Sequence, residues 1–481
     1  MNSRGEQLEK HEIVKAKLSA LLEKEDMKKF CQIWEACSDM SFYIQQKLPN
    51  MYIQKELPNK KNVFGTDMSN FIPQSFEELY IESNHTDDKM TTKSIAELLN
   101  APVKKEIAKG DCDSNDSFQP IIDFPNLLLI VLKITRMQEK GFNPSEFTLD
   151  DKELINEFDK VKLTPEFVKQ FAYNLLLAKY FLDNYMVHHI NGEDKAIENP
   201  WKLQYYCKKG KSVYMADLID YDKSKQRELV HLLSMFEVAF TAKQRKNYLF
   251  YCLLHLFNDW DEDNYLKFVR NLADKYFFDE TIIRNGKLNV GLENVYRNFN
   301  GIYPQGSSNI PLFVFNYTDY RLWKKYADEL RGNRAKKGSK ARSEFFIALG
   351  CGDFGLETFD DFYFSRTRKS LEHYYPQAKA GEDKPITPEE INCFGNFAMI
   401  GSDANSSGSN WNPTVKNECY LDSKSNQVSV ASLKFRIMLQ MCQDNKELKE
   451  DDKRDSGFEW NADDMQKHQE KILSIIMQPT H

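Results

Sequence analysis

The residues most able to do chemistry lie close to position 372. Glu372 and His373 are adjacent in the stretch SLEHYYPQ, residues 370–377. An imidazole titrates near neutral pH, so His373 can remove a proton from a water molecule. On an extended segment Glu372 points to the opposite side, where its carboxylate can bind a hard cation such as Mg²⁺. A base and a cation held together are what hydrolysis of a phosphodiester requires.

Two asparagines follow this pair. Asn396 and Asn405 are nine residues apart and flank a short apolar run, residues 397–400, which predicts a strand. A carboxamide can fix the ring of a base histidine by hydrogen bonding, and its oxygen can also ligate Mg²⁺. A strand, a loop and a second strand leading to a helical turn would bring all four side chains together.

At this point the pattern resembles a known domain. The order E-H-x-x-P-Q, then G-N, then an asparagine nine residues later, then S-N and K, is similar to the ββα-metal (HNH) domain of the GmrSD family of modification-dependent restriction endonucleases. The HNH domain of the CRISPR RNA-guided nucleases has a similar acid-His-x-x-Pro-Gln segment and the same asparagine interval. The match extends over about 45 residues, with Glu372 standing where many HNH sites have aspartate.

The resemblance implies a role for each matched residue. Glu372 and Asn405 would bind the cation, Mg²⁺ or another divalent ion such as Mn²⁺. His373 would be the general base, and Asn396 would orient that base or the scissile phosphate. Gly395 would permit a close backbone turn. Four further side chains would contact DNA: Arg366, Arg368, Asn410 and Lys416.

Each part of the pattern also has a plain structural explanation. A single histidine in an aromatic segment is usually structural, and NSSGSN alone would be an ordinary loop. Residues 331–342, RGNRAKKGSKAR, hold six positive charges and no acid. This segment is either a solvated linker or a phosphate-contacting segment that leads into the catalytic domain. The joint pattern around His373 favours a nuclease.

Helices dominate the rest of the sequence. Helical periodicity predicts two helices within residues 1–48 and three more at about 225–240, 242–258 and 262–276. Thr164 and Pro165 have the types expected of a cap and a first helical residue. Two final helices are expected at about 429–445 and 459–477. We therefore predict a mainly α chain, with a helical scaffold followed by a small α+β ββα-metal domain.

Composition narrows the possibilities. The 481 residues are 41% hydrophobic and 28% charged, as in a globular protein. A net charge of −7 weighs mildly against nonspecific coating of nucleic acid but allows a local basic patch. The nine cysteines include no C-x-x-C spacing, so no zinc ribbon or redox motif is indicated. Neither a signal peptide nor an apolar run long enough to span a bilayer is evident, which predicts a cytoplasmic protein without membrane contact.

The N-terminus adds a second, weaker resemblance. Residues 1–18 are similar to the late segment of the ParB-like nucleotide-hydrolysing domain that usually precedes the nuclease in GmrSD-like proteins. The family's Asp-Gly-Gln-Gln-Arg stretch is absent from the sequence, which predicts a truncated frame or one half of a split protein whose partner chain supplies the missing part. Arg4 and Gly5 would complete a nucleotide pocket in such an assembly, or else simply cap the first helix. The nucleotide-binding residues stay unknown.

Four regions are predicted from these features. They are a ParB-like remnant (1–60), a polar insert (61–118), a helical connector (119–340) and an HNH domain with C-terminal helices (341–481). The predicted function is a metal-dependent endonuclease that cleaves DNA in restriction or anti-phage defence. The alternative is a truncated or split subunit that binds DNA or a partner without cutting. RNA also stays open as a substrate, because one-metal HNH chemistry does not itself select the sugar.

Overall fold

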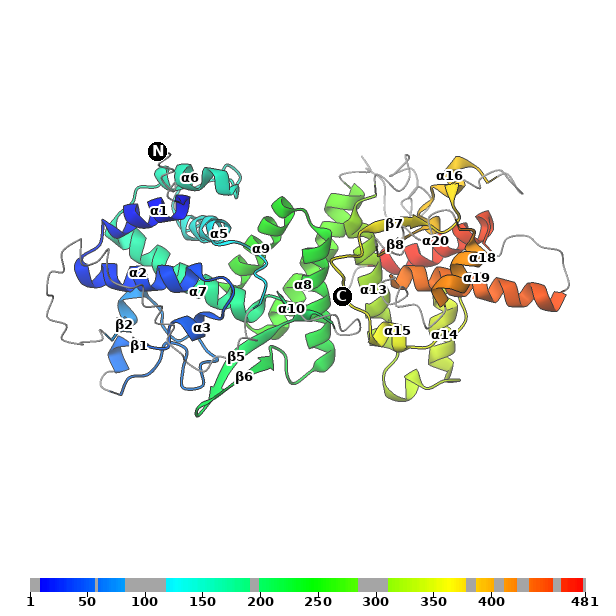
Figure 1. Cartoon of the computed structure of the whole chain (residues 1–481), viewed down its shortest axis with the longest axis horizontal. Helices are drawn as coiled ribbons and strands as arrows, with labels where there is room; N and C mark the ends of the chain where they lie inside the picture. Colours follow the sequence, from blue (N-terminus) through cyan, green and yellow to red (C-terminus); the bar gives the residue numbers. More distant parts are fainter. Residues whose placement is uncertain are drawn as a thin grey trace, which may run out of the picture. The chain divides into compact units, whose positions relative to one another are not determined.

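The chain divides into two compact units. The computed structural model describes residues 9–56, 59–82, 118–190, 199–283, 310–377, 386–401, 411–421, 432–452 and 460–478 (Figure 1). The N-terminal unit comprises Met1–Asn191, Leu203–Leu218 and Leu249–Phe257. The C-terminal unit comprises Gly192–Lys202, Ile219–Tyr248 and Asn258–His481. The predicted connector, residues 119–340, is therefore divided between the two units.

The N-terminal unit is built around one long helix, α7 (Pro165–Tyr185). The Thr164 hydroxyl accepts a hydrogen bond from the Phe167 amide at 3.2 Å, and Pro165 occupies the first turn, so the helix begins where the sequence predicts. Most of its side chains are buried, and it packs against helices on two sides. The other helices of this unit are α1 (Lys10–Ser19), α2 (Lys24–Ser38), α3 (Ile44–Lys47), α5 (Phe124–Arg136) and α6 (Leu154–Asp159), with short 3₁₀ turns η1 (Gln54–Glu56), η2 (Phe76–Glu78) and η3 (Asp151–Glu153).

Two small antiparallel sheets complete the N-terminal unit. Strand β1 (Met51–Ile53) pairs with β2 (Leu79–Ile81). Strand β5 (Gln204–Lys209) pairs with β6 (Ser212–Asp217) around a turn in which Gly210 has a positive φ of 63°. Such a φ favours glycine, because a Cβ would be strained there. A further short strand, β3, covers His188–His189.

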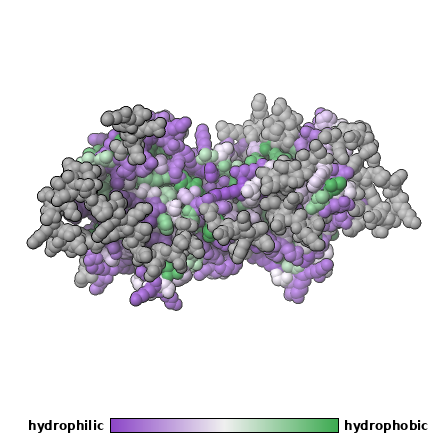
Figure 2. Space-filling view, in the orientation of Figure 1, coloured by the Kyte–Doolittle hydropathy of each residue, from purple (hydrophilic) through white to green (hydrophobic). Residues whose placement is uncertain are grey.

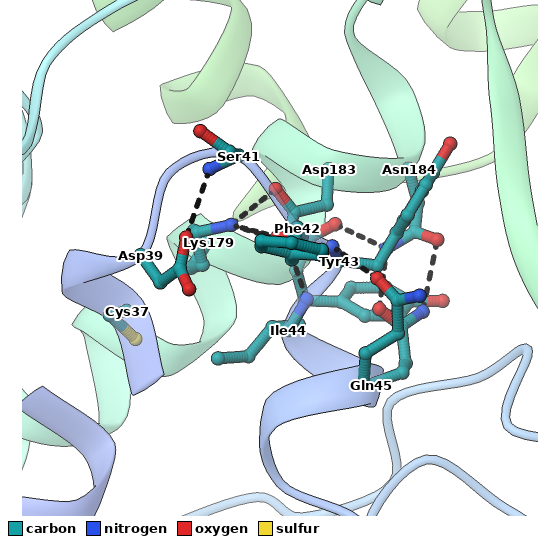
Figure 3. Close-up of polar contacts among 12 residues, drawn as sticks. Cys37, Asp39, Ser41, Phe42, Tyr43, Ile44, Gln45, Lys179, Asp183 and Asn184 are labelled. Atoms are coloured by element: carbon teal, nitrogen blue, oxygen red, sulfur yellow. Dashed lines mark hydrogen bonds and ion pairs between the residues drawn. The ribbon is translucent and has the colours of Figure 1, made fainter. Parts of the chain in front are cut away.

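A buried polar network holds α3 on α7 (Figure 3). Lys179 and Asp183 are one turn apart on α7, and their side chains are 2.6 Å apart and almost completely buried. Lys179 also donates to the Phe42 carbonyl at 2.8 Å, and Asp183 accepts from the Ile44 amide at 2.7 Å. Burial raises the pKa of Asp183 to about 6, although Lys179 opposes that shift. The ion pair thus provides hydrogen-bond partners for two main-chain groups that lie beside it, the Phe42 carbonyl and the Ile44 amide.

The C-terminal unit is organised around α13 (Leu312–Glu329), which is buried along most of its length and packs against α8, α19 and α20. Its helices are α8 (Lys223–Ala239), α10 (Glu262–Lys275), α13, α14 (Lys340–Leu349), α15 (Glu357–Asp360), α16 (Pro388–Ile391), α18 (Pro413–Leu421), α19 (Leu433–Asp452) and α20 (Ala462–Ile476), with η4 (Tyr276–Ile283), η6 (Gly332–Ala335) and η8 (Phe394–Asn396). Helix α9 (Ala242–Leu256) is divided between the two units after Tyr248. The strands are β4 (Trp201–Lys202), β7 (Ser370–His373) and β8 (Phe397–Ile400).

The structure confirms the mainly helical prediction. Helices α8, α9 and α10 lie within two residues of the predicted bounds, and α20 covers most of the predicted last helix. Helix α19 begins later and ends later than predicted, at Leu433 and Asp452. Large apolar side chains are mostly buried, and the described surface in Figure 2 is largely hydrophilic. Within the described ranges no helix is both long and apolar enough to cross a membrane.

Candidate active site

Glu372 and His373 end a short strand in the C-terminal unit, as predicted. Strand β7 pairs antiparallel with β8, with Glu372 opposite Ala398 and His373 opposite Phe397. Glu372 is buried while His373 is half-buried, because successive side chains of a strand point to opposite faces. All four residues of β8 are buried, so the hairpin is anchored in the core through β8. The Glu372 carboxylate and the His373 imidazole are thus held on opposite faces of the same strand, β7.

The His373 ring is held by Asn392, a residue that the sequence analysis did not select. Its Nε2 lies 3.1 Å from Oδ1 of Asn392, and its ring packs 4.1 Å, centroid to centroid, from the ring of Phe397. The Asn392 Nδ2 donates to the Pro388 carbonyl at 2.8 Å, and its Oδ1 also accepts from Gln377 at 3.0 Å. A carbonyl can only accept, so these contacts fix Oδ1 toward the histidine.

This orientation settles the tautomer of the neutral ring. Because Oδ1 of Asn392 is an acceptor, Nε2 of His373 carries the proton and Nδ1 keeps a free electron pair. Burial lowers the pKa of His373 below its usual 6.5; the bond to Asn392 opposes that shift, and the nearby Lys416 charge adds to it. The imidazole is therefore neutral at pH 7. A neutral ring with a free Nδ1 has the form that a general base needs.

Glu372 contacts a lysine from the helix that follows the hairpin. The ammonium of Lys416, on α18, forms an ion pair with Oε1 of Glu372, and both side chains are buried. The same ammonium donates to the carbonyls of His373, at 2.5 Å, and Tyr374, at 3.1 Å. Burial raises the pKa of Glu372 and lowers the pKa of Lys416, while their mutual attraction opposes both shifts. The ion pair joins α18 to the end of β7.

Asn396 is fully buried, and its carboxamide is used by the protein itself. Its Oδ1 accepts from the Tyr375 amide at 2.8 Å and from the Trp460 indole at 3.2 Å. Its Nδ2 donates to the carbonyls of Tyr375, at 3.1 Å, and Ile391, at 2.9 Å. Both amide hydrogens are thereby occupied. Asn396 positions the chain just after His373, and the residue that hydrogen-bonds to the His373 ring is Asn392.

Gly395 lies where the backbone of η8 closely approaches α20. A Cβ added at this position would overlap the Met465 carbonyl of α20, and the Gly395 amide donates to the Gln469 side chain at 3.2 Å. Helix α20 also packs against η8, which holds Gly395 and Asn396. The absence of a side chain lets the two backbones touch.

The expected phosphate contacts are distributed differently. Arg368 is buried, donates to the Tyr363 carbonyl at 2.7 Å and lies 5.0 Å from the Phe362 ring centroid. Lys416 is buried against Glu372. These two side chains lack the exposure that contact with phosphate requires. Arg366 is half-buried, with its guanidinium 5.0 Å from the Trp201 ring centroid. Asn405 and Asn410 lie outside the described residues.

The basic segment forms a turn that leads into α14. Arg331 and Arg342 at its ends are held by the protein, Arg342 through two contacts of 2.7 Å with Asp353. Three side chains between them are exposed and form no hydrogen bond or ion pair with any residue that the structure describes: Arg334, Lys336 and Lys337. In Figure 1 helix α14 lies at the lower side of the C-terminal unit, away from β7 and β8.

The donor set suits a hard cation held by few protein ligands. The described ranges contain no group of three or more His, Cys, Asp or Glu side chains placed to hold a metal ion. Mg²⁺ does not require such a group, because it keeps several water ligands and often binds through one or two carboxylates. Glu372 supplies one buried carboxylate, already next to a positive charge. Glu372 therefore suits Mg²⁺ in type, with Lys416 as a competing positive charge, and the described residues do not form a structural zinc site.

No family model, curated protein or solved structure matches this chain.

Proposed function

We propose that this chain is a metal-dependent endonuclease of the HNH type. One observation carries the proposal: Glu372 and His373 end β7, β7 pairs with β8, and α18 follows and bonds back to them through Lys416. Strand, strand and helix in this order, with an acid and a neutral histidine on the first strand, are the arrangement that the sequence resemblance implies. The substrate would be DNA, and the setting would be restriction or anti-phage defence against foreign or modified DNA.

The chemistry follows from the tautomer of His373. Its free Nδ1 takes a proton from a water molecule while the water oxygen attacks phosphorus and the bond from phosphorus to the leaving oxygen breaks. Asn392 stabilises the imidazolium that forms, because its Oδ1 already accepts from Nε2. A divalent cation bound by Glu372 and Asn405 would stabilise the negative charge on the phosphate and the leaving oxygen.

The exposed basic turn, which leads into α14 and lies away from β7 and β8, would contact the nucleic acid outside the candidate active site. Arg334, Lys336 and Lys337 carry three charges that no described acid neutralises through an ion pair. Contacts with phosphates give affinity without sequence preference and orient the duplex. We include this turn in the proposed DNA-binding surface, in place of the buried Arg368 and Lys416.

Cleavage by a histidine variant tests the proposal. Purified chain is incubated with unmodified and cytosine-modified plasmid DNA in Mg²⁺, and nicking is followed on gels. We expect His373→Ala to reduce the rate at least about 100-fold, since a general base contributes about 10²–10⁴. EDTA should abolish nicking, since it removes the cation that would stabilise the negative charge on the phosphate. The control is His11→Ala, which removes another half-buried histidine, in the N-terminal unit. Undiminished nicking by folded His373→Ala would contradict the assignment.

A further inference from the structure

The ammonium of Lys416 lies beside the Glu372 carboxylate, where the proposed cation would bind. Its ammonium meets three oxygen atoms: the Glu372 carboxylate, the His373 carbonyl and the Tyr374 carbonyl. All three belong to consecutive residues at the end of β7. Lys416 itself is 0% exposed, so solvent and phosphate cannot reach it in this conformation.

An ammonium group matches this position chemically. It has three hydrogens and no acceptor, so it can donate to all three oxygens at once. A carboxylate that is only 4% exposed needs a neighbouring positive charge, because an isolated buried charge is very costly. Lys416 therefore completes both the charge balance and the hydrogen bonding of residues 372–374.

We propose that Lys416 is an internal counter-charge for the metal-binding carboxylate: it holds Glu372 and the His373 backbone in place without metal, and it competes with the cation for the carboxylate. The inference rests on the proposed function, since it takes Glu372 as a metal ligand. Lys416 is on this view a positioning residue, and it does not contact substrate. A divalent ion arriving at Glu372 must approach a fixed positive charge, so the lysine weakens metal binding while it keeps the empty site ordered.

The C-terminal unit offers a matched control. Lys434, on α19, is also buried, and its ammonium donates to two main-chain carbonyls, those of Phe394 and Phe397. Among the residues described, no carboxylate lies within ion-pair distance of it. Lys434→Met therefore removes a buried ammonium from the same unit without removing a partner of Glu372.

The experiment measures Mn²⁺ binding to the full chain by calorimetry, and thermal melting with and without Mn²⁺. The proteins are wild type, Lys416→Met, Lys416→Gln, Glu372→Gln and Lys434→Met. We expect both Lys416 variants to bind Mn²⁺ about tenfold more tightly than wild type, because one repelling charge is gone. Their melting temperatures should also rise more with Mn²⁺. Glu372→Gln should lose the site, and Lys434→Met should bind as wild type does.

The outcomes separate the two proposals. Equal or weaker Mn²⁺ binding by folded Lys416 variants, with Glu372-dependent binding in wild type, overturns the counter-charge role and leaves the nuclease proposal standing. If none of the proteins binds Mn²⁺ through Glu372, the proposed metal site and the counter-charge role both fail. If the Lys416 variants are unfolded without metal, refolding on addition of Mn²⁺ supports the role, and failure to refold contradicts it.

Discussion

Oδ1 of Asn392 lies 3.1 Å from Nε2 of His373, and this contact determines which ring nitrogen can act as a base. The carboxamide is itself held at 2.8 Å by the Pro388 carbonyl. A loop residue 19 positions from the histidine thus sets the tautomer.

The contact predicts a shift in the pH profile. The pKa of His373 is lowered by burial, so the wild-type cleavage rate should be independent of pH above about 7 and fall as the ring protonates below 6.5. Asn392→Asp should stabilise the imidazolium, raise this pKa and move the acid limb to higher pH. Asn392→Ala should reduce the rate about 10–100-fold. Single-turnover rates between about pH 5 and 8 measure both effects, and identical profiles for wild type and Asn392→Asp would contradict the assigned tautomer.

Substitution of Gly395 should disturb the site through packing. The Cβ of Gly395→Ala would overlap the Met465 carbonyl, so α20 must shift away from η8. We expect a loss of about 1–3 kcal/mol in the free energy of unfolding, together with reduced activity. Gly141→Ala, in the N-terminal unit, is the comparison: the φ of Gly141 is 88° and the space around it is open, so the substitution should cost about 1 kcal/mol and leave activity intact. Denaturant melts and cleavage rates decide whether the close contact exists.

Neutralising the basic turn should weaken DNA binding without changing chemistry. The triple variant Arg334→Gln, Lys336→Gln, Lys337→Gln removes three exposed charges. The slope of log affinity against log salt should then become shallower by up to about 3, since each phosphate contact contributes about 0.9. Fluorescence anisotropy at several salt concentrations gives the slope. A slope unchanged from wild type would show that the turn is only solvated.

The buried ion pair of α7 should be essential to the N-terminal unit. Lys179→Met leaves the Asp183 carboxylate buried without its cation, which we expect to cost about 3–5 kcal/mol in the free energy of unfolding. Lys24→Met, at an exposed lysine of α2, should change it by less than about 0.5 kcal/mol. Denaturation followed by circular dichroism compares the two. A loss below about 1 kcal/mol for Lys179→Met would mean that solvent reaches the pair.

Local features were predictable from the sequence, and long-range partners were not. Thr164 and Pro165 mark the start of α7 because capping depends on neighbouring residues alone. The opposite orientations of Glu372 and His373 follow from the alternation of a strand. Asn392 lies on a loop with no periodic pattern, so nothing in the sequence linked it to the His373 ring.

Burial of charged residues was the main error in anticipating the site. Lys416 and Arg368 have the types and spacing of phosphate contacts, but both are buried. The partner of Lys416, Glu372, comes from a distant segment, whereas Arg368 bonds locally to the Tyr363 carbonyl. A charged side chain is usually exposed, so sequence alone favours the surface. The structure instead places these two charges where they hold the site's own backbone and carboxylate.

The hydrogen bonds of Asn396 determine the minimal fragment in which the structure of the candidate site would be preserved. Its carboxamide ties the end of β7 to Ile391 and to Trp460, which lies just before the Asn461 cap of α20. The 45 residues that carry the sequence resemblance therefore could not be moved into another protein with the site intact. A fragment cut after α18 would lose the indole donor and the helix that touches Gly395. Grafting or domain-swapping experiments on this chain must carry residues through Ile476.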